Sequence, residues 1–96
     1  MAKIALITGA TSGIGAASAN TFAAEGYDLI LIARRENLLD AQAQQLVEQH
    51  SIKVKKIQAD VRDKENINYV LETLPTEWKN VDVLVNIAGL SQGLDP

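Results

Sequence analysis

Cysteine is absent from this chain of 96 residues, which excludes a disulfide framework and any metal site built on thiolates. No apolar run approaches the roughly 18 residues that a membrane-spanning helix needs. Basic residues do not dominate, since the formal net charge is −3, and this argues against a nucleic-acid binder. With 47% hydrophobic residues, the sequence is too apolar for intrinsic disorder. The composition therefore predicts a soluble cytoplasmic chain that forms one domain at most.

The chain is organised around an apolar run, 4–8, that is followed by three closely spaced glycines and an alanine-rich helical stretch. Dinucleotide-binding turns have this order of strand, glycine turn and helix. We assign Gly9 to the tight turn, Gly13 to close approach by a pyrophosphate, and Gly15 to packing of the helix near the sheet. Unpaired N–H groups at the helix start suit a phosphate, and two hydroxyl groups add donors. The candidate residues here are Gly9, Ala10, Thr11, Ser12, Gly13, Ile14 and Gly15; a turn without a ligand is the alternative.

Hydrophobic periodicity predicts that strands and helices alternate along the chain. Strands are predicted at 3–8, 28–33, 53–58 and 81–86, and helices at 13–25, 35–50 and from the N-cap Asp63 to Pro75. The second helix is predicted to carry one apolar face made of Leu39, Ala43, Leu46 and Val47. The alternation predicts an α/β fold with a parallel sheet and helices on both faces. Lysines in 53–58 suit a sheet edge, so the predicted strand order is 3-2-1-4.

The last predicted strand, 81–86, is as apolar as the central strand, although the predicted order leaves it at an edge. An apolar edge strand favours aggregation or assembly. We therefore expect residues 1–96 to be the first, N-terminal half of a single doubly wound domain, cut at Pro96. The alternative is a short natural protein that dimerises through this strand.

Two arginines follow the second predicted strand, where NAD-binding proteins of this architecture carry an acidic residue for the ribose 2′-hydroxyl. The guanidinium groups of Arg34 and Arg35 suit a 2′-phosphate instead, because they form charge-assisted and often bidentate bonds. The sequence therefore predicts NADP(H) in preference to NAD(H). In the alternative interpretation, both arginines are solvated residues that open the second helix.

Polar and small residues follow the third and fourth predicted strands on the same side of the sheet. The Asp60 carboxylate is positioned to accept from the adenine amino group, and the Val61 N–H to meet a ring nitrogen. Asn86 is positioned to bond backbone groups, while Ala88 and Gly89 leave room for a ligand against the backbone. The alternatives are a local turn bond for Asp60 and a simple strand-to-loop turn after Asn86.

Together these segments resemble the short-chain dehydrogenase/reductase family along the whole chain. The resemblance rests on Thr8-Gly9-x-x-x-Gly13-Ile14-Gly15, Arg34-Arg35, Asp60-Val61 and Asn86-x-Ala88-Gly89. A further segment is similar to the NADP-dependent 3-hydroxy acid (serine/allo-threonine) dehydrogenases. It comprises Leu74-Pro75, Glu77-Trp78, Asn80, Asp82, Leu84-Val85-Asn86, Gly89-Leu90 and Gly93-Leu94-x-Pro96. Ile87 departs from the family, which usually repeats asparagine there.

The resemblance implies a Rossmann-like fold, NADP(H) as cofactor, a small alcohol or ketone as substrate of the longer protein, and a homo-oligomer. It puts residues 9–14 on the pyrophosphate and adenosine ribose, and Arg34 and Arg35 on the 2′-phosphate. It puts Asp60 and Val61 on adenine, and the nicotinamide ribose near Asn86, Ala88 and Gly89. No metal is implied.

The family's catalytic pair is a tyrosine followed four residues later by a lysine. Tyr27 is followed at that distance by Leu31, and Tyr69 by Thr73. Ser91 lies too early in the chain to be the family's serine. The resemblance therefore implies that these 96 residues lack the catalytic residues and are inactive alone.

The function that the sequence favours is hydride transfer between NADP(H) and a secondary alcohol or ketone, with this chain supplying the cofactor-binding half. The alternative from another class is a non-catalytic Rossmann module for nucleotide binding or folding. A methyltransferase is disfavoured by Arg34, because those sites usually carry an acidic residue after the second strand.

Overall fold

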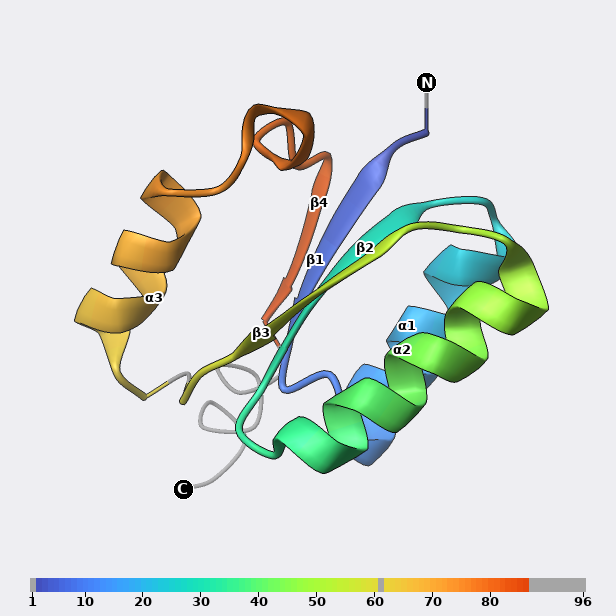
Figure 1. The fold of residues 1–96 in the computed structure, drawn as a ribbon, viewed down its shortest axis with the longest axis horizontal. Helices are drawn as coiled ribbons and strands as arrows, with labels where there is room; N and C mark the ends of the chain where they lie inside the picture. Colours follow the sequence, from blue (N-terminus) through green and yellow to red (C-terminus); the bar gives the residue numbers. More distant parts are fainter. Residues whose placement is uncertain (1, 61, 87–96) are drawn as a thin grey trace.

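The computed structural model describes residues 2–60 and 62–86. Its centre is a four-stranded parallel sheet made of β1 (Ile4–Thr8), β2 (Asp28–Ala33), β3 (Val54–Gln58) and β4 (Val83–Asn86). The strand order is β3-β2-β1-β4, which confirms the predicted order. Helices α1 (Gly13–Ala24) and α2 (Glu36–His50) cover one face of the sheet, and α3 (Lys64–Glu72) covers the other (Figure 1). A short 3-10 turn that the sequence did not indicate, η1 (Thr76–Trp78), leads into β4.

Apolar side chains cover both faces of the two central strands. In β1, Ala5 and Ile7 face α1 and α2, while Ile4 and Leu6 face α3, and β2 repeats this alternation. Full burial of such a side chain contributes about 1.5–3 kcal/mol for residues of the size of leucine and isoleucine. Apolar side chains therefore pack on both faces of the sheet.

Small residues let α1 lie close to the sheet. Its buried positions are Gly15, Ala19 and Ala23, four residues apart and therefore on one face of the helix. The helix ends before Gly26, whose φ of 88° is in the left-handed region that glycine adopts easily. The chain then turns directly into β2.

Helix α2 buries Leu39, Ala43 and Leu46 as predicted. Val47 does not belong to that face, because its side chain is 42% exposed. At 3.6 residues per turn, Val47 points roughly 100° away from Leu46 and past the edge of the buried stripe. The helix begins at Glu36, so Arg35 is its N-cap residue and makes no side-chain capping bond.

Helix α3 lies over the opposite face and begins as predicted, since the Asp63 carboxylate accepts a hydrogen bond of 3.2 Å from the Asn66 N–H. Its apolar residues are only partly buried against the sheet. Leu74 and Trp78, which follow the helix, are buried in the same cluster. The segment between α3 and β4 therefore closes the core on this side. None of the helices in the described ranges is long and apolar enough to cross a lipid bilayer.

Strand β4 lies at the edge of the described sheet and is anchored to β1. The Asp82 carboxylate accepts a 2.9 Å bond from the Ile4 N–H, and the Asp82 N–H donates to the Ile4 carbonyl at 2.8 Å. Val83 and Val85 pack against the cluster under α1 and α2. Leu84 points to the other face and is 63% exposed. The edge strand is thus apolar on its open face, as the sequence predicts.

Candidate functional site

The four strands end at one edge of the sheet because they are parallel and in register. Thr8 pairs with Ile32 of β2 and with Asn86 of β4, and Ala33 of β2 pairs with Gln58 of β3. The loops that follow these ends carry the glycine turn, the two arginines and the Asp60 carboxylate. The structure therefore brings the predicted site residues of the described ranges to one rim. The other predicted site residues, Val61, Ala88 and Gly89, lie outside the described residues.

The glycine turn leaves β1 tightly and is tied to β2. Gly9 has a φ of 65°, and the Ala10 N–H donates to the Ile32 carbonyl at 3.1 Å. A Cβ on Gly15 would overlap the Gly9 carbonyl oxygen, whereas a Cβ on Gly13 would meet nothing within 4 Å. Gly15 is therefore required by the contact between α1 and its own preceding turn, while the backbone at Gly13 is open to a ligand.

Ser12 holds the turn together through its hydroxyl group. The Ser12 Oγ donates to the Gly9 carbonyl at 2.8 Å and accepts from the Gly15 N–H at 3.2 Å. The hydroxyl that the sequence suggested as a phosphate donor is therefore used as the helix cap. The N–H groups of Gly13 and Ile14 are the donors that the first turn of a helix leaves without intrahelical partners. Both residues are exposed.

Arg34 and Arg35 follow β2 and are exposed. The Gln58 Nε2 donates to the Arg34 carbonyl at 3.1 Å, which links the ends of β2 and β3. Among the described residues, the ion pairs are Lys56–Asp40 and Arg62–Asp60, so neither guanidinium group is paired there. Two guanidinium groups beside the turn that form no ion pair within residues 2–60 and 62–86 are suited to an anion.

The Asp60 carboxylate is occupied by Arg62, a residue that sequence reasoning missed. Its Oδ1 accepts from the Arg62 backbone N–H at 2.9 Å and from Nε at 3.1 Å, and its Oδ2 accepts from Nη2 at 2.8 Å. These bonds from Arg62, with a smaller contribution from the Arg34 charge, lower the pKa of Asp60 to about 2. This is the local turn bond that the sequence left open as the alternative. The sequence signal that could have indicated this pair is an aspartate two residues before an arginine, just after a strand.

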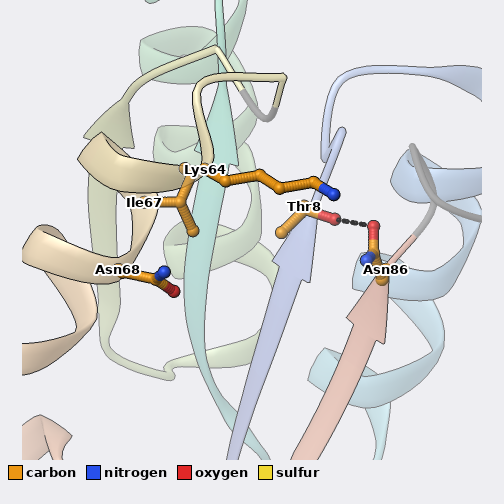
Figure 2. A pocket seen from close by; sticks show the side chains of 5 residues that line it. All are labelled: Thr8, Lys64, Ile67, Asn68 and Asn86. Carbon is orange, nitrogen blue, oxygen red and sulfur yellow. Dashed lines mark hydrogen bonds between the residues drawn. The ribbon is translucent and has the colours of Figure 1, made fainter.

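A pocket of about 250 Å³ lies at the same rim, on the α3 side of the sheet. The Thr8 hydroxyl donates to the Asn86 Oδ1 at 3.0 Å and thereby joins the ends of β1 and β4 (Figure 2). The side chain of Lys64, at the start of α3, extends toward this pair. The pocket is lined by Thr8, Lys64, Ile67, Asn68 and Asn86. It is too small to enclose a whole dinucleotide. No group of three or more metal-ligating side chains occurs in the described ranges.

A model of the short chain dehydrogenase family matches residues 3–95. The chain belongs to this family. A sulfoacetaldehyde reductase of Chromohalobacter salexigens is 43% identical over 96 residues, which are 100% of this chain and 37% of that protein. An NADP-dependent 3-hydroxy acid dehydrogenase of Salmonella typhimurium is 41% identical over 93 residues, which are 97% of this chain and 36% of that protein.

A solved reductase structure has a similar fold. L-sorbose reductase from Gluconobacter frateurii, in complex with NADPH and L-sorbose, matches with a TM-score of 0.79 and 36% identity, over 86% of this chain and 32% of that one. The Rossmann-like fold and the family resemblance are thereby confirmed, including the similarity to 3-hydroxy acid dehydrogenases. The chain spans little more than a third of the length of the curated relatives named above, at 37% and 36%.

Proposed function

We propose that this chain is the cofactor-binding part of an NADP(H)-dependent short-chain dehydrogenase. The observation that carries the proposal is that the open glycine turn and two arginines, which form no ion pair with any other described residue, meet at one edge of the sheet. Ligands of open α/β sheets bind at the carboxyl ends of the strands. NADP dependence in the 3-hydroxy acid dehydrogenase relative and bound NADPH in the L-sorbose reductase structure support the same cofactor.

The residues of the rim fit the cofactor's phosphates. The N–H groups of Gly13 and Ile14 would donate to the pyrophosphate, which the lack of a Cβ at Gly13 allows to approach. Arg34 and Arg35 would bind the 2′-phosphate through charge-assisted bonds. When bound, the cofactor would supply the hydride at the nicotinamide C4, and the protein's task is to position it.

The adenine and the nicotinamide ribose are assigned to residues that carry less specific groups than the arginines and the glycine turn proposed for the phosphates. Asp60 and Val61 follow β3 and are proposed at the adenine. Asn86, Ala88 and Gly89 are proposed near the nicotinamide ribose. Asn86 accepts a hydrogen bond from Thr8 at the end of β1. Its role would therefore be to fix the two strand ends on which the ribose would lie.

Catalysis by these residues alone is not expected. Tyr27 precedes β2 at the amino edge of the sheet and packs edge-on against Phe22, with ring centres 5.0 Å apart. Tyr69 is 65% exposed on α3. Neither is followed by the family's lysine, so we propose that the chain binds the cofactor and turns over no substrate. The substrates in the relatives' names, a 3-hydroxy acid, sulfoacetaldehyde and L-sorbose, support a small polar alcohol or carbonyl compound for the longer enzyme.

The proposal is tested by calorimetric titration of NADP⁺ and NAD⁺ into the chain and into Arg34→Ala/Arg35→Ala. We expect the parent to prefer NADP⁺, and the variant to bind NADP⁺ about 100-fold more weakly, since bonds to charged groups contribute roughly 1.5–3 kcal/mol each. NAD⁺ binding should change little. Lys53→Gln/Lys79→Gln removes the same net charge at the amino edge and should leave both affinities unchanged. Equal affinity of the parent for both dinucleotides would refute the NADP assignment.

A further inference from the structure

A carboxylate stands beside the proposed 2′-phosphate site, and this requires an explanation. Asp60 follows β3, next to the end of β2 that carries Arg34, and the Gln58–Arg34 bond of 3.1 Å holds the two strand ends together. The positive charge of Arg34 interacts with Asp60 and contributes to lowering the pKa of that carboxyl group. A free carboxylate at this place would compete with a phosphate for Arg34 and would repel the phosphate directly.

Arg62 occupies this carboxylate from both oxygens. Nε lies 3.1 Å from Oδ1 and 3.2 Å from Oδ2, Nη2 lies 2.8 Å from Oδ2, and the Arg62 backbone N–H adds a bond of 2.9 Å to Oδ1. Three N–H donors of Arg62 thus engage both oxygens of the carboxylate, the Nε–H being shared between them. No bond or ion pair joins the Arg34 guanidinium to Asp60 among the described residues.

We propose that Arg62 is a specificity-determining residue for the cofactor. Because Arg62 binds the Asp60 carboxylate, Arg34 is available to bind the 2′-phosphate. Arg62 itself does not contact the cofactor. The inference rests on the proposed function, and it explains how a rim with an acidic residue favours a cofactor that carries an additional phosphate. Because Arg62 and Asp60 are 66% and 35% exposed, solvent screens the effect, which is therefore a several-fold preference and weakens with salt.

The test measures the ratio of the NAD⁺ to the NADP⁺ dissociation constant, so that adenine contacts, which both cofactors share, cancel. In Arg62→Gln this ratio should fall about fivefold, as expected for one uncompensated charge close to a phosphate in water. Asp60→Asn in the same chain should restore it, because the repelling charge is then gone. Lys56→Gln breaks the other ion pair of the described structure, Lys56–Asp40, and serves as the control with an unchanged ratio.

The outcomes separate this inference from the proposed function. If the parent prefers NADP⁺ and Arg62→Gln keeps that preference, the inference is wrong and the proposed function stands. If Arg62→Gln lowers the ratio but Asp60→Asn does not restore it, Arg62 contacts the phosphate itself and the inference is also wrong. If the parent binds neither dinucleotide, the proposed function fails, and the inference falls with it. Asp60→Asn alone, which keeps Arg62, should leave the ratio unchanged or raise it, and a lower ratio contradicts the inference.

Discussion

Gly13 and Gly15 stand two residues apart in one turn, yet a side chain would meet different surroundings at each position. At Gly15 a Cβ collides with the Gly9 carbonyl, which belongs to a turn fixed by backbone bonds. We expect Gly15→Ala to lower the free energy of unfolding by about 1–3 kcal/mol, as overpacking does. Gly13→Ala should keep or slightly raise it, because alanine favours a helix over glycine by about 0.5–1 kcal/mol. Urea denaturation measures both.

Cofactor affinity separates Gly13→Ala from the parent, although the stability of this variant is not reduced. If the pyrophosphate lies on Gly13, the added methyl group of Gly13→Ala should weaken NADP⁺ binding in a chain of undiminished stability. A Gly15→Ala variant as stable as the parent would show that the turn can shift away from the added carbon, and it would contradict the packing role of Gly15.

The Asp60–Arg62 pair predicts a pH effect. Arg62 lowers the pKa of Asp60 from 3.8 to about 2, so the ionised carboxylate stabilises the folded state. That contribution is complete above pH 3.8 and is lost as the pH falls through about 2. We expect an NMR titration of the Asp60 carboxyl carbon to give a midpoint near 2 in the parent and a higher one in Arg62→Gln, still below 3.8 because the backbone N–H of residue 62 keeps its bond to the carboxylate. A midpoint near 3.8 in both proteins would mean that the pair does not form in solution.

At the scale of secondary structure, hydrophobic periodicity and residue polarity were sufficient to predict the strands, the helices and the strand order. Runs of buried apolar residues marked the central strands, and lysines in β3 marked an edge, so the order β3-β2-β1-β4 followed from composition alone. Asp63 caps the start of α3, and Gly26 follows the end of α1, as their chemistry predicts. Such features depend on one segment at a time, and local rules are sufficient for them.

Features that depend on which groups meet after folding were not predicted. The Ser12 hydroxyl closes the turn on Gly9, and Arg62 takes the Asp60 carboxylate. Lys64 reaches the rim from the start of α3 (Figure 2). The prediction that Val47 shares the core-facing side of α2 was wrong. The three buried residues of that helix already fill its contact with the core. These features depend on which side chains meet once the chain has folded, and spacing in the sequence does not encode them.

Helix α3 depends on its N-cap, because its apolar residues are only partly buried. Asp63→Ala removes the acceptor of the Asn66 N–H and should cost about 1 kcal/mol. Amide hydrogen exchange should accelerate most in α3, while β1 and β2 stay protected. Asp63→Ser retains an oxygen acceptor and should restore most of the protection. Uniform loss of protection across the sheet would show that α3 does not fray independently.

At the scale of the whole molecule, self-association is predicted from β4, which lies at the edge of the described sheet and carries the exposed Leu84. An apolar side chain on an edge strand is a surface for pairing with a second copy, and a lysine there opposes it. We expect Leu84→Lys to shift the sedimentation profile toward the monomer at high concentration. Leu38→Lys, at an apolar residue of α2 that is 42% exposed, is the matched control and should have a smaller effect. A parent that stays monomeric at every concentration contradicts the prediction.

The central claim is that a dinucleotide lies across the carboxyl edge of this sheet, and chemical-shift mapping tests it most directly. NADP⁺ is titrated into the isotope-labelled chain, and the backbone amide shifts are followed. We predict that the amides of Gly9, Gly13, Ile14 and Arg34 move together with one affinity, while those of Lys53 and Asp82 at the amino edge stay fixed. Shifts confined to the amino edge, or no shifts at saturating NADP⁺, would contradict the account.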